Sequence, residues 1–128
     1  MNQFILVALF TSCMISNAAY ALGNSQNYER CMRTVMNKTE DIKACQLKEF
    51  KIQNKRMEKQ YKLTLKSADL TEKESVKVSQ DIWLKSRENV CRVQNNKPKD
   101  YVVSQTSCLL QMTTSHADML EVRLSNKN

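Results

Sequence analysis

The chain has 128 residues, of which 26% are charged, and a formal net charge of +7 at pH 7. This length suits a single domain. One glycine and one proline in the whole sequence provide too few turn residues for an all-β fold, so long helices are favoured.

Residues 1–21 are predicted to be a signal peptide. The segment 4–15 is mostly apolar and too short to cross a bilayer as a helix. Ala19-Tyr20-Ala21 fits the small-x-small pattern of a cleavage site, so we expect a mature chain that begins at Leu22 and contains no transmembrane helix. The alternative is a lipoprotein signal with Cys13 as the lipidated residue. It is the weaker interpretation, because the three residues before Cys13 match such signals poorly.

Residues 22–128 are expected to form one periplasmic, or otherwise exported, domain with two disulfides. An even number of cysteines remains after signal removal, which in a small exported domain indicates disulfides rather than free thiols. No pair has the close C-x-x-C spacing of a zinc site, and we predict no bound metal. The four cysteines are Cys31, Cys45, Cys91 and Cys108.

Four helices are predicted in chain order. The first is short and spans about residues 26–36. The second is capped by Thr39 and runs to about residue 66. The third starts at the capping box Thr71-Glu72-Lys73-Glu74 and ends near residue 93, and the fourth spans about 101–124. The predicted fold is all-α: a small antiparallel bundle of about four helices, two of them long, stapled by two disulfides at one end.

The third predicted helix carries polar side chains on its apolar face. At helical spacing, Gln80, Trp83 and Arg87 share this face with Val76 and Val90. A buried Gln or Arg must be hydrogen-bonded, so we interpret these residues as core residues with polar partners rather than as a binding site. The candidate partners are Glu49, Asn54, Glu58 and Tyr61. The expected core face of the second helix consists of Leu47, Phe50, Met57, Tyr61 and Leu65.

Distances from the predicted turns indicate which residues lie at the same height. In antiparallel neighbours, residues equally far from a turn are level, so the four cysteines are expected in one layer, with their pairing left open. By the same measure Glu49 and Arg87 are level, which permits an ion pair, although Glu49 points away from the expected core face. Beyond the cysteine layer, the second and third helices continue as an arm of roughly 35 Å.

The order Q-x-x-W-x-x-x-R-x-x-x-C, from Gln80 to Cys91, resembles the lysozyme-inhibitor LprI-like family of small exported helical proteins. Asn54, Glu58 and His116 stand where that family has Asp, Asn and Arg. The resemblance implies local disulfides, Cys31–Cys45 and Cys91–Cys108, a periplasmic location and, as in some relatives, inhibition of lysozyme. The matching positions are Cys31, Cys45, Glu49, Tyr61, Gln80, Trp83, Arg87, Cys91, Cys108, Thr113 and Leu120.

Six lysines recur at helical spacing along the second predicted helix and form one stripe. Like charges at these spacings destabilise a helix slightly, so the stripe is either a solvated face or a surface for an anionic partner. Ile52 and Leu63 lie beside it and either pack on the fourth helix or belong to the partner surface. The stripe consists of Lys48, Lys51, Lys55, Lys59, Lys62 and Lys66.

These patterns favour a non-enzymatic protein that binds another macromolecule. The single histidine, His116, lacks the partners of a catalytic site, and we predict no catalytic residues and no cofactor. Export argues against nucleic acid. The expected partner is a protein such as lysozyme or another cell-wall-active enzyme, and the alternative is an anionic lipid or glycan surface of the envelope. Common animal lysozymes are themselves strongly basic, so charge matching favours a different, acidic target.

Overall fold

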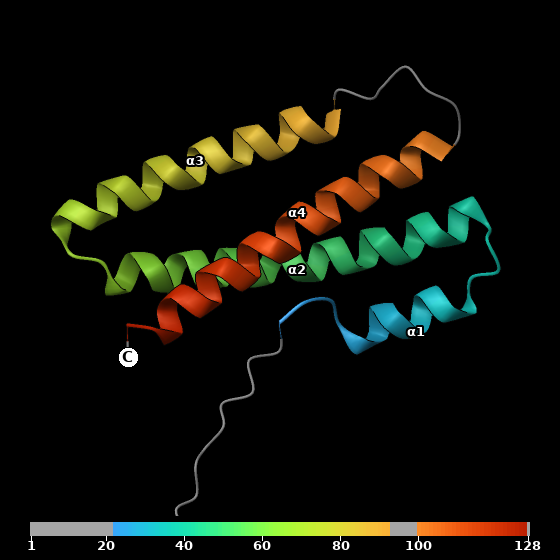
Figure 1. Cartoon of the computed structure of the whole chain (residues 1–128), viewed down its shortest axis with the longest axis horizontal. Coiled ribbons are helices and arrows are strands. Elements are labelled where there is room, and N and C mark those ends of the chain that lie inside the picture. The colour runs from blue at the N-terminus through green and yellow to red at the C-terminus, as the bar shows by residue number, and fades with distance from the viewer. Residues whose placement is uncertain (1–21, 93–99, 128) are drawn as a thin grey trace, which may run out of the picture.

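A computed structural model describes residues 22–92 and 100–127 and places them in four helices (Figure 1). The predicted all-α bundle is confirmed, and the fourth helix is long as well as the second and third. The helices are α1 (Gln26–Thr34), α2 (Thr39–Ser67), α3 (Leu70–Arg92) and α4 (Asp100–Ser125).

The predicted caps of α2 and α3 are wrong in detail. Thr39 is already helical, and Lys38, which stands at the cap position, makes no side-chain capping bond. The cap of α3 is Asp69, whose Oδ1 accepts a hydrogen bond from the backbone N of Glu72 at 2.8 Å. Asp69 lies two residues before the predicted cap, Thr71. The helix can begin there because an aspartate carboxylate is as effective as a threonine hydroxyl in accepting a hydrogen bond from a free N–H of the first turn.

The three long helices run up, down and up, so α2 and α4 are parallel and α3 is antiparallel to both (Figure 1). α2 makes its largest interface with α4 and smaller ones with α1 and α3. Small side chains of α4, such as Thr113 and Ala117, are fully buried at this interface and allow the helices to approach closely. The apolar centre of the bundle is formed by Met57, Ala117 and Leu120, with Tyr61, Trp83 and Leu84 packed against them.

The predicted core face of α2 is only partly correct. Met57 is buried, but Leu47 is 37% exposed and the other predicted members are only partly buried. The packing of α4 shifts burial to the neighbouring face, where polar residues prevail. The buried residues of α2 are Cys45, Gln46, Glu49, Gln53, Met57 and Thr64.

Both disulfides form as local pairs, Cys31–Cys45 and Cys91–Cys108, with Cα–Cα distances of 5.8 and 5.6 Å. Thr106, two residues before Cys108, donates a hydrogen bond to Gln46, the neighbour of Cys45. The two bridges therefore lie at the same end of the bundle, as predicted. Each closes a short loop, and by the chain-entropy account each stabilises the fold by about 3 kcal/mol.

α1 and the residues before it cover one half of the α2–α4 interface. The backbone N of Gly23 donates to both carboxylate oxygens of Asp118, at 3.0 and 3.1 Å, and Thr114 Oγ1 donates to Asn24 Oδ1 at 3.3 Å. From there α1 runs toward the disulfide end (Figure 1). The half nearer the C-terminal ends of α2 and α4 is not covered by α1.

Candidate functional site

Arg87 joins the three long helices. Its side chain, on α3, is buried, and its Nη1 donates to Asn54 Oδ1 of α2 and to Thr113 Oγ1 of α4, both at 3.0 Å. Its Nη2 forms an ion pair of 3.0 Å with the exposed Glu88. The predicted polar partner Asn54 is thus found, and Thr113, known beforehand only as a position of the family pattern, is the second.

Aromatic rings flank the Arg87 guanidinium. Its central carbon lies 5.5 Å from the ring centre of Phe50 and 5.1 Å from that of Trp83, within the range of cation–π attraction. Trp83 also contacts His116, whose ring is stacked on it with centroids 3.9 Å apart. Four side chains from three helices therefore form one layered group, in which Trp83 contacts both Arg87 and His116.

Gln80 joins Arg87, Phe50, Trp83 and His116 in this group, and we call these five residues the Arg87 network. Gln80 Nε2 lies 3.1 Å from Met57 Sδ, and its Oε1 lies 2.8 Å from His116 Nε2, so that ring nitrogen is the donor. Burial, and then the positive charge of Arg87, lower the pKa of His116 to about 4. The imidazole is therefore neutral at pH 7. Val90, which was predicted on the same face, is 52% exposed, because it lies at the edge of the face that buries Gln80, Arg87 and Cys91.

Glu49 is held by the segment before α1 and not by Arg87. It is 1% exposed and accepts hydrogen bonds from Ser25 N at 2.7 Å, Ser25 Oγ at 2.6 Å and Gln53 Nε2 at 2.7 Å. Ser25 Oγ in turn accepts from Tyr28 N and caps α1. The Glu49–Arg87 pair permitted by the sequence is thus not formed. The Ser25–Glu49 contact connects the segment before α1 to α2. The sequence feature that could have indicated it is a serine directly before a short helix.

The six lysines of the stripe are all exposed. They lie on the side of α2 away from the residues buried under α4, and none of them takes part in an ion pair within residues 22–92 and 100–127. Ile52 and Leu63, at the edge of the stripe, are 40% and 42% exposed. The lysine stripe is therefore a continuous basic surface bordered by apolar side chains.

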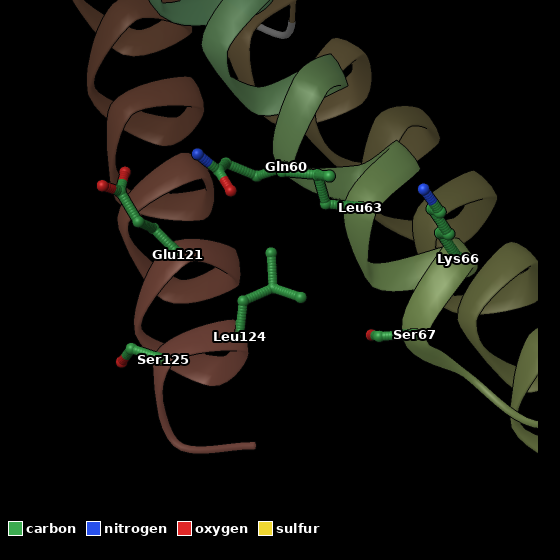
Figure 2. A pocket seen from close by; sticks show the side chains of 7 residues that line it. All are labelled: Gln60, Leu63, Lys66, Ser67, Glu121, Leu124 and Ser125. Atoms are coloured by element: carbon green, nitrogen blue, oxygen red, sulfur yellow. The ribbon is translucent and has the colours of Figure 1, made fainter. Parts of the chain in front are cut away.

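Two of the open grooves among the described residues border α2. The first lies between α2 and α3, has a volume of about 340 Å³ and includes Tyr61 and Gln80 in its lining, with Arg87 at its wall. The second lies between the C-terminal halves of α2 and α4 and has a volume of about 460 Å³ (Figure 2). It includes Leu63, from the edge of the lysine stripe, and Leu124, which the sequence did not single out as part of a site.

The remaining chemistry of the described residues is sparse. Within residues 22–92 and 100–127, no three His, Cys, Asp or Glu side chains lie close enough together to bind a metal ion. In the same part of the chain, no helix is both long and apolar enough to cross a membrane. The arrangement can present charge and apolar surface to a macromolecule, with the Arg87 network as its internal support.

Comparison with protein families gave a match that covers most of the chain. The family model described as Lysozyme inhibitor LprI matches residues 31–120, which include both disulfides and most of every long helix. Comparison with curated proteins gave no match, and comparison with solved structures gave none.

Proposed function

Since the chain belongs to the lysozyme inhibitor LprI family, we propose that it is an exported, non-enzymatic protein that binds and inhibits a cell-wall-active enzyme, a lysozyme or another hydrolase of the wall. The Arg87 network uses the polar residues of the family pattern internally. Gln80, Trp83 and Arg87 bond or stack with one another or with their neighbours in the bundle. The partner must therefore be recognised largely by residues outside this network, on the surface of the domain.

The observation that carries the proposal is the lysine stripe. Six like charges repel one another, and the buried residues of α2 already account for its packing, so the fold does not require them. A surface of this kind attracts an acidic partner and accelerates its association. We therefore propose that the target presents an acidic contact face, in contrast to the strongly basic common lysozymes of animals.

Export of residues 22–128 after removal of residues 1–21 is part of this proposal. Two disulfides in a small domain support an oxidising compartment such as the periplasm. Mass analysis of the exported protein is expected to give a chain that begins at Leu22. A lipid on Cys13 would instead make it an anchored lipoprotein.

The test is an inhibition and binding assay with the oxidised mature domain and a panel of acidic and basic cell-wall hydrolases, including several lysozymes. We expect inhibition of an acidic member, with an association rate that falls as salt rises. Replacing Lys51, Lys55, Lys59 and Lys62 with Gln should slow that association.

The matched control changes the net charge equally outside the stripe, by replacing Lys73, Lys77, Lys85 and Lys127 with Gln. Its effect should be clearly smaller, because none of these lysines belongs to the stripe and two of them, Lys77 and Lys127, already pair with Glu74 and Glu72. Equal rates for wild type and both variants, at low and moderate salt, would contradict a role for the stripe.

A second candidate function is attachment to anionic lipid or glycan of the envelope. The exposed Ile52 and Leu63 beside the lysines favour it, because apolar side chains next to basic ones are typical of surfaces that lie on membranes. Binding to vesicles of phosphatidylglycerol and phosphatidylcholine that fades steeply with salt, without inhibition of any hydrolase, would support this alternative.

A further inference from the structure

The α2–α4 groove has an occupied half and an open half. In the occupied half, a peptide segment of the chain itself lies against both helices, with Gly23 bonded to Asp118 and Ser25 bonded to Glu49. Gln53 Nε2 also donates to the carbonyl of Gly23 at 3.1 Å. This half shows what the groove accommodates: a short, bent segment held largely through its backbone, followed by a helix.

The open half has an apolar floor. Leu63 of α2 and Leu124 of α4 point toward each other across the space between the helices, as Figure 2 shows. Leu63 is 42% exposed although it lies beside a concave surface, where a large apolar side chain is normally covered.

The charges around the open half are unequal. Glu121 is paired with Arg56, whose Nε and Nη2 lie 2.9 and 2.5 Å from Glu121 Oε2, and Arg56 Nη2 also pairs with Asp118 Oδ1 at 2.7 Å. Lys66, at the opposite wall, has no ion pair among the described residues, and Lys62 lies one turn before it on the same stripe. The net charge presented at this wall is therefore positive.

From this arrangement we propose that the open half of the α2–α4 groove is the docking site for an acidic segment of a partner protein, with one large apolar side chain between Leu63 and Leu124 and a carboxylate on Lys66. The identification of the partner as a protein rests on the proposed function. A concave site between two helices fits an inserted side chain, which is the usual form of an interface anchor. A lipid surface would instead require the apolar residues on a convex face.

The test uses fluorescent peptides and the mature, oxidised domain. One short peptide has glutamates on both sides of a single leucine, and the second has alanine in place of that leucine. Wild type should bind the leucine peptide about fivefold more tightly, since part of a leucine side chain is buried in the groove. Leu63→Ser should abolish this preference, and Lys66→Gln should weaken both peptides.

The matched control is Val78→Ser, because Val78 on α3 is 48% exposed but lies outside the groove. It should keep the preference, and circular dichroism should show that both serine variants remain folded. Equal binding of the two peptides by wild type, no binding of either, or loss of the preference in Val78→Ser would overturn the proposal.

Two further measurements separate the alternatives. Binding to anionic vesicles that is lost in Leu63→Ser, without peptide preference, would identify a lipid surface and overturn the proposal. The peptide assay needs no hydrolase. Failure to inhibit any hydrolase would therefore refute the proposed function, while the peptide result would still decide whether the groove accepts an acidic, apolar segment.

Discussion

The Arg87 network and the lysine stripe place positively charged side chains in opposite environments. Arg87 is 7% exposed and has an ion-pair partner, two neutral hydrogen-bond acceptors and two aromatic neighbours. The six lysines are exposed and have no ion pair among the described residues. The difference indicates that the buried cation serves the fold, because it is compensated within the domain, and it supports the proposal that the exposed lysines serve recognition.

Truncation in the Arg87 network should have the largest effect on stability. Trp83→Ala removes the ring stacked on His116 and near Arg87, and we expect it to lower the free energy of unfolding by about 3 kcal/mol. Trp83→Phe, the control, should lose much less. Denaturant unfolding measures both. A Trp83→Ala domain as stable as wild type would show that Trp83 is not a packing residue and would break the comparison.

Glu49→Gln should have the next largest effect. It replaces a buried carboxylate that accepts hydrogen bonds from Ser25 and Gln53, and we expect a loss of about 2 kcal/mol. The control is Glu58→Gln, since Glu58 is exposed and should change stability by less than about 0.5 kcal/mol. Equal effects of the two variants would mean that the contact with the segment before α1 adds little to stability.

The lowered pKa of His116 predicts that the stability of the domain depends on pH. This dependence arises in the Arg87 network and not on the lysine stripe. The pKa of His116 is about 4 in the folded domain and 6.5 ordinarily, so the unfolded chain binds its proton more readily between these values. Its contribution is thus complete above pH 6.5 and is lost as the pH falls to 4. We expect this loss to be about 1 kcal/mol, because water screens the partly exposed ring.

The measurement is the melting temperature of wild type and His116→Gln across this pH range. Carboxylates with lowered pKa values, such as Glu72, also lose their contribution in acid, but they do so in both proteins. The difference between the two curves should therefore shrink toward pH 4. Parallel curves would mean that the His116 ring is as easily protonated in the folded domain as in the unfolded chain.

The smallest effect on stability is expected on the lysine stripe. Replacing Lys51, Lys55, Lys59 and Lys62 with Gln should leave the free energy of unfolding unchanged or raise it by about 0.5 kcal/mol or less, since repulsion along α2 is relieved. Thermal unfolding checks this. A marked destabilisation would show that these lysines support the fold, and the contrast with Arg87 would disappear.

Features that depend on local sequence or chain distances could be predicted. The four helices and the cysteine layer follow from helical spacing and from equal distances to the turns. Asn54 was only one of four candidate partners of Arg87, and equal distance to the turn indicated Glu49 instead. The disulfide pairing needed the family resemblance as well, because every pairing lies within one layer.

Features that depend on which helix covers which face could not be predicted. Gln46 and Gln53 are buried because α4 and the segment before α1 offer them partners, and a polar residue gives no periodic apolar signal. The groove at Leu63 and Leu124 also escaped prediction. It exists because α2 and α4 run in parallel and α1 covers only half of their interface, which is a property of the assembled fold.

The way in which α3 is attached to α2 and α4 affects which substitutions the domain tolerates. The helix is joined to α2 by the short turn at residues 68–69 and to α4 by the Cys91–Cys108 bond, while its interfaces with both are modest. Covalent links at both ends thus keep it in place, and its outer residues, such as Val78 and Ile82, are exposed. Substitutions there leave the helix where it is, so α3 offers a surface on which new sequence can be introduced without rebuilding the bundle.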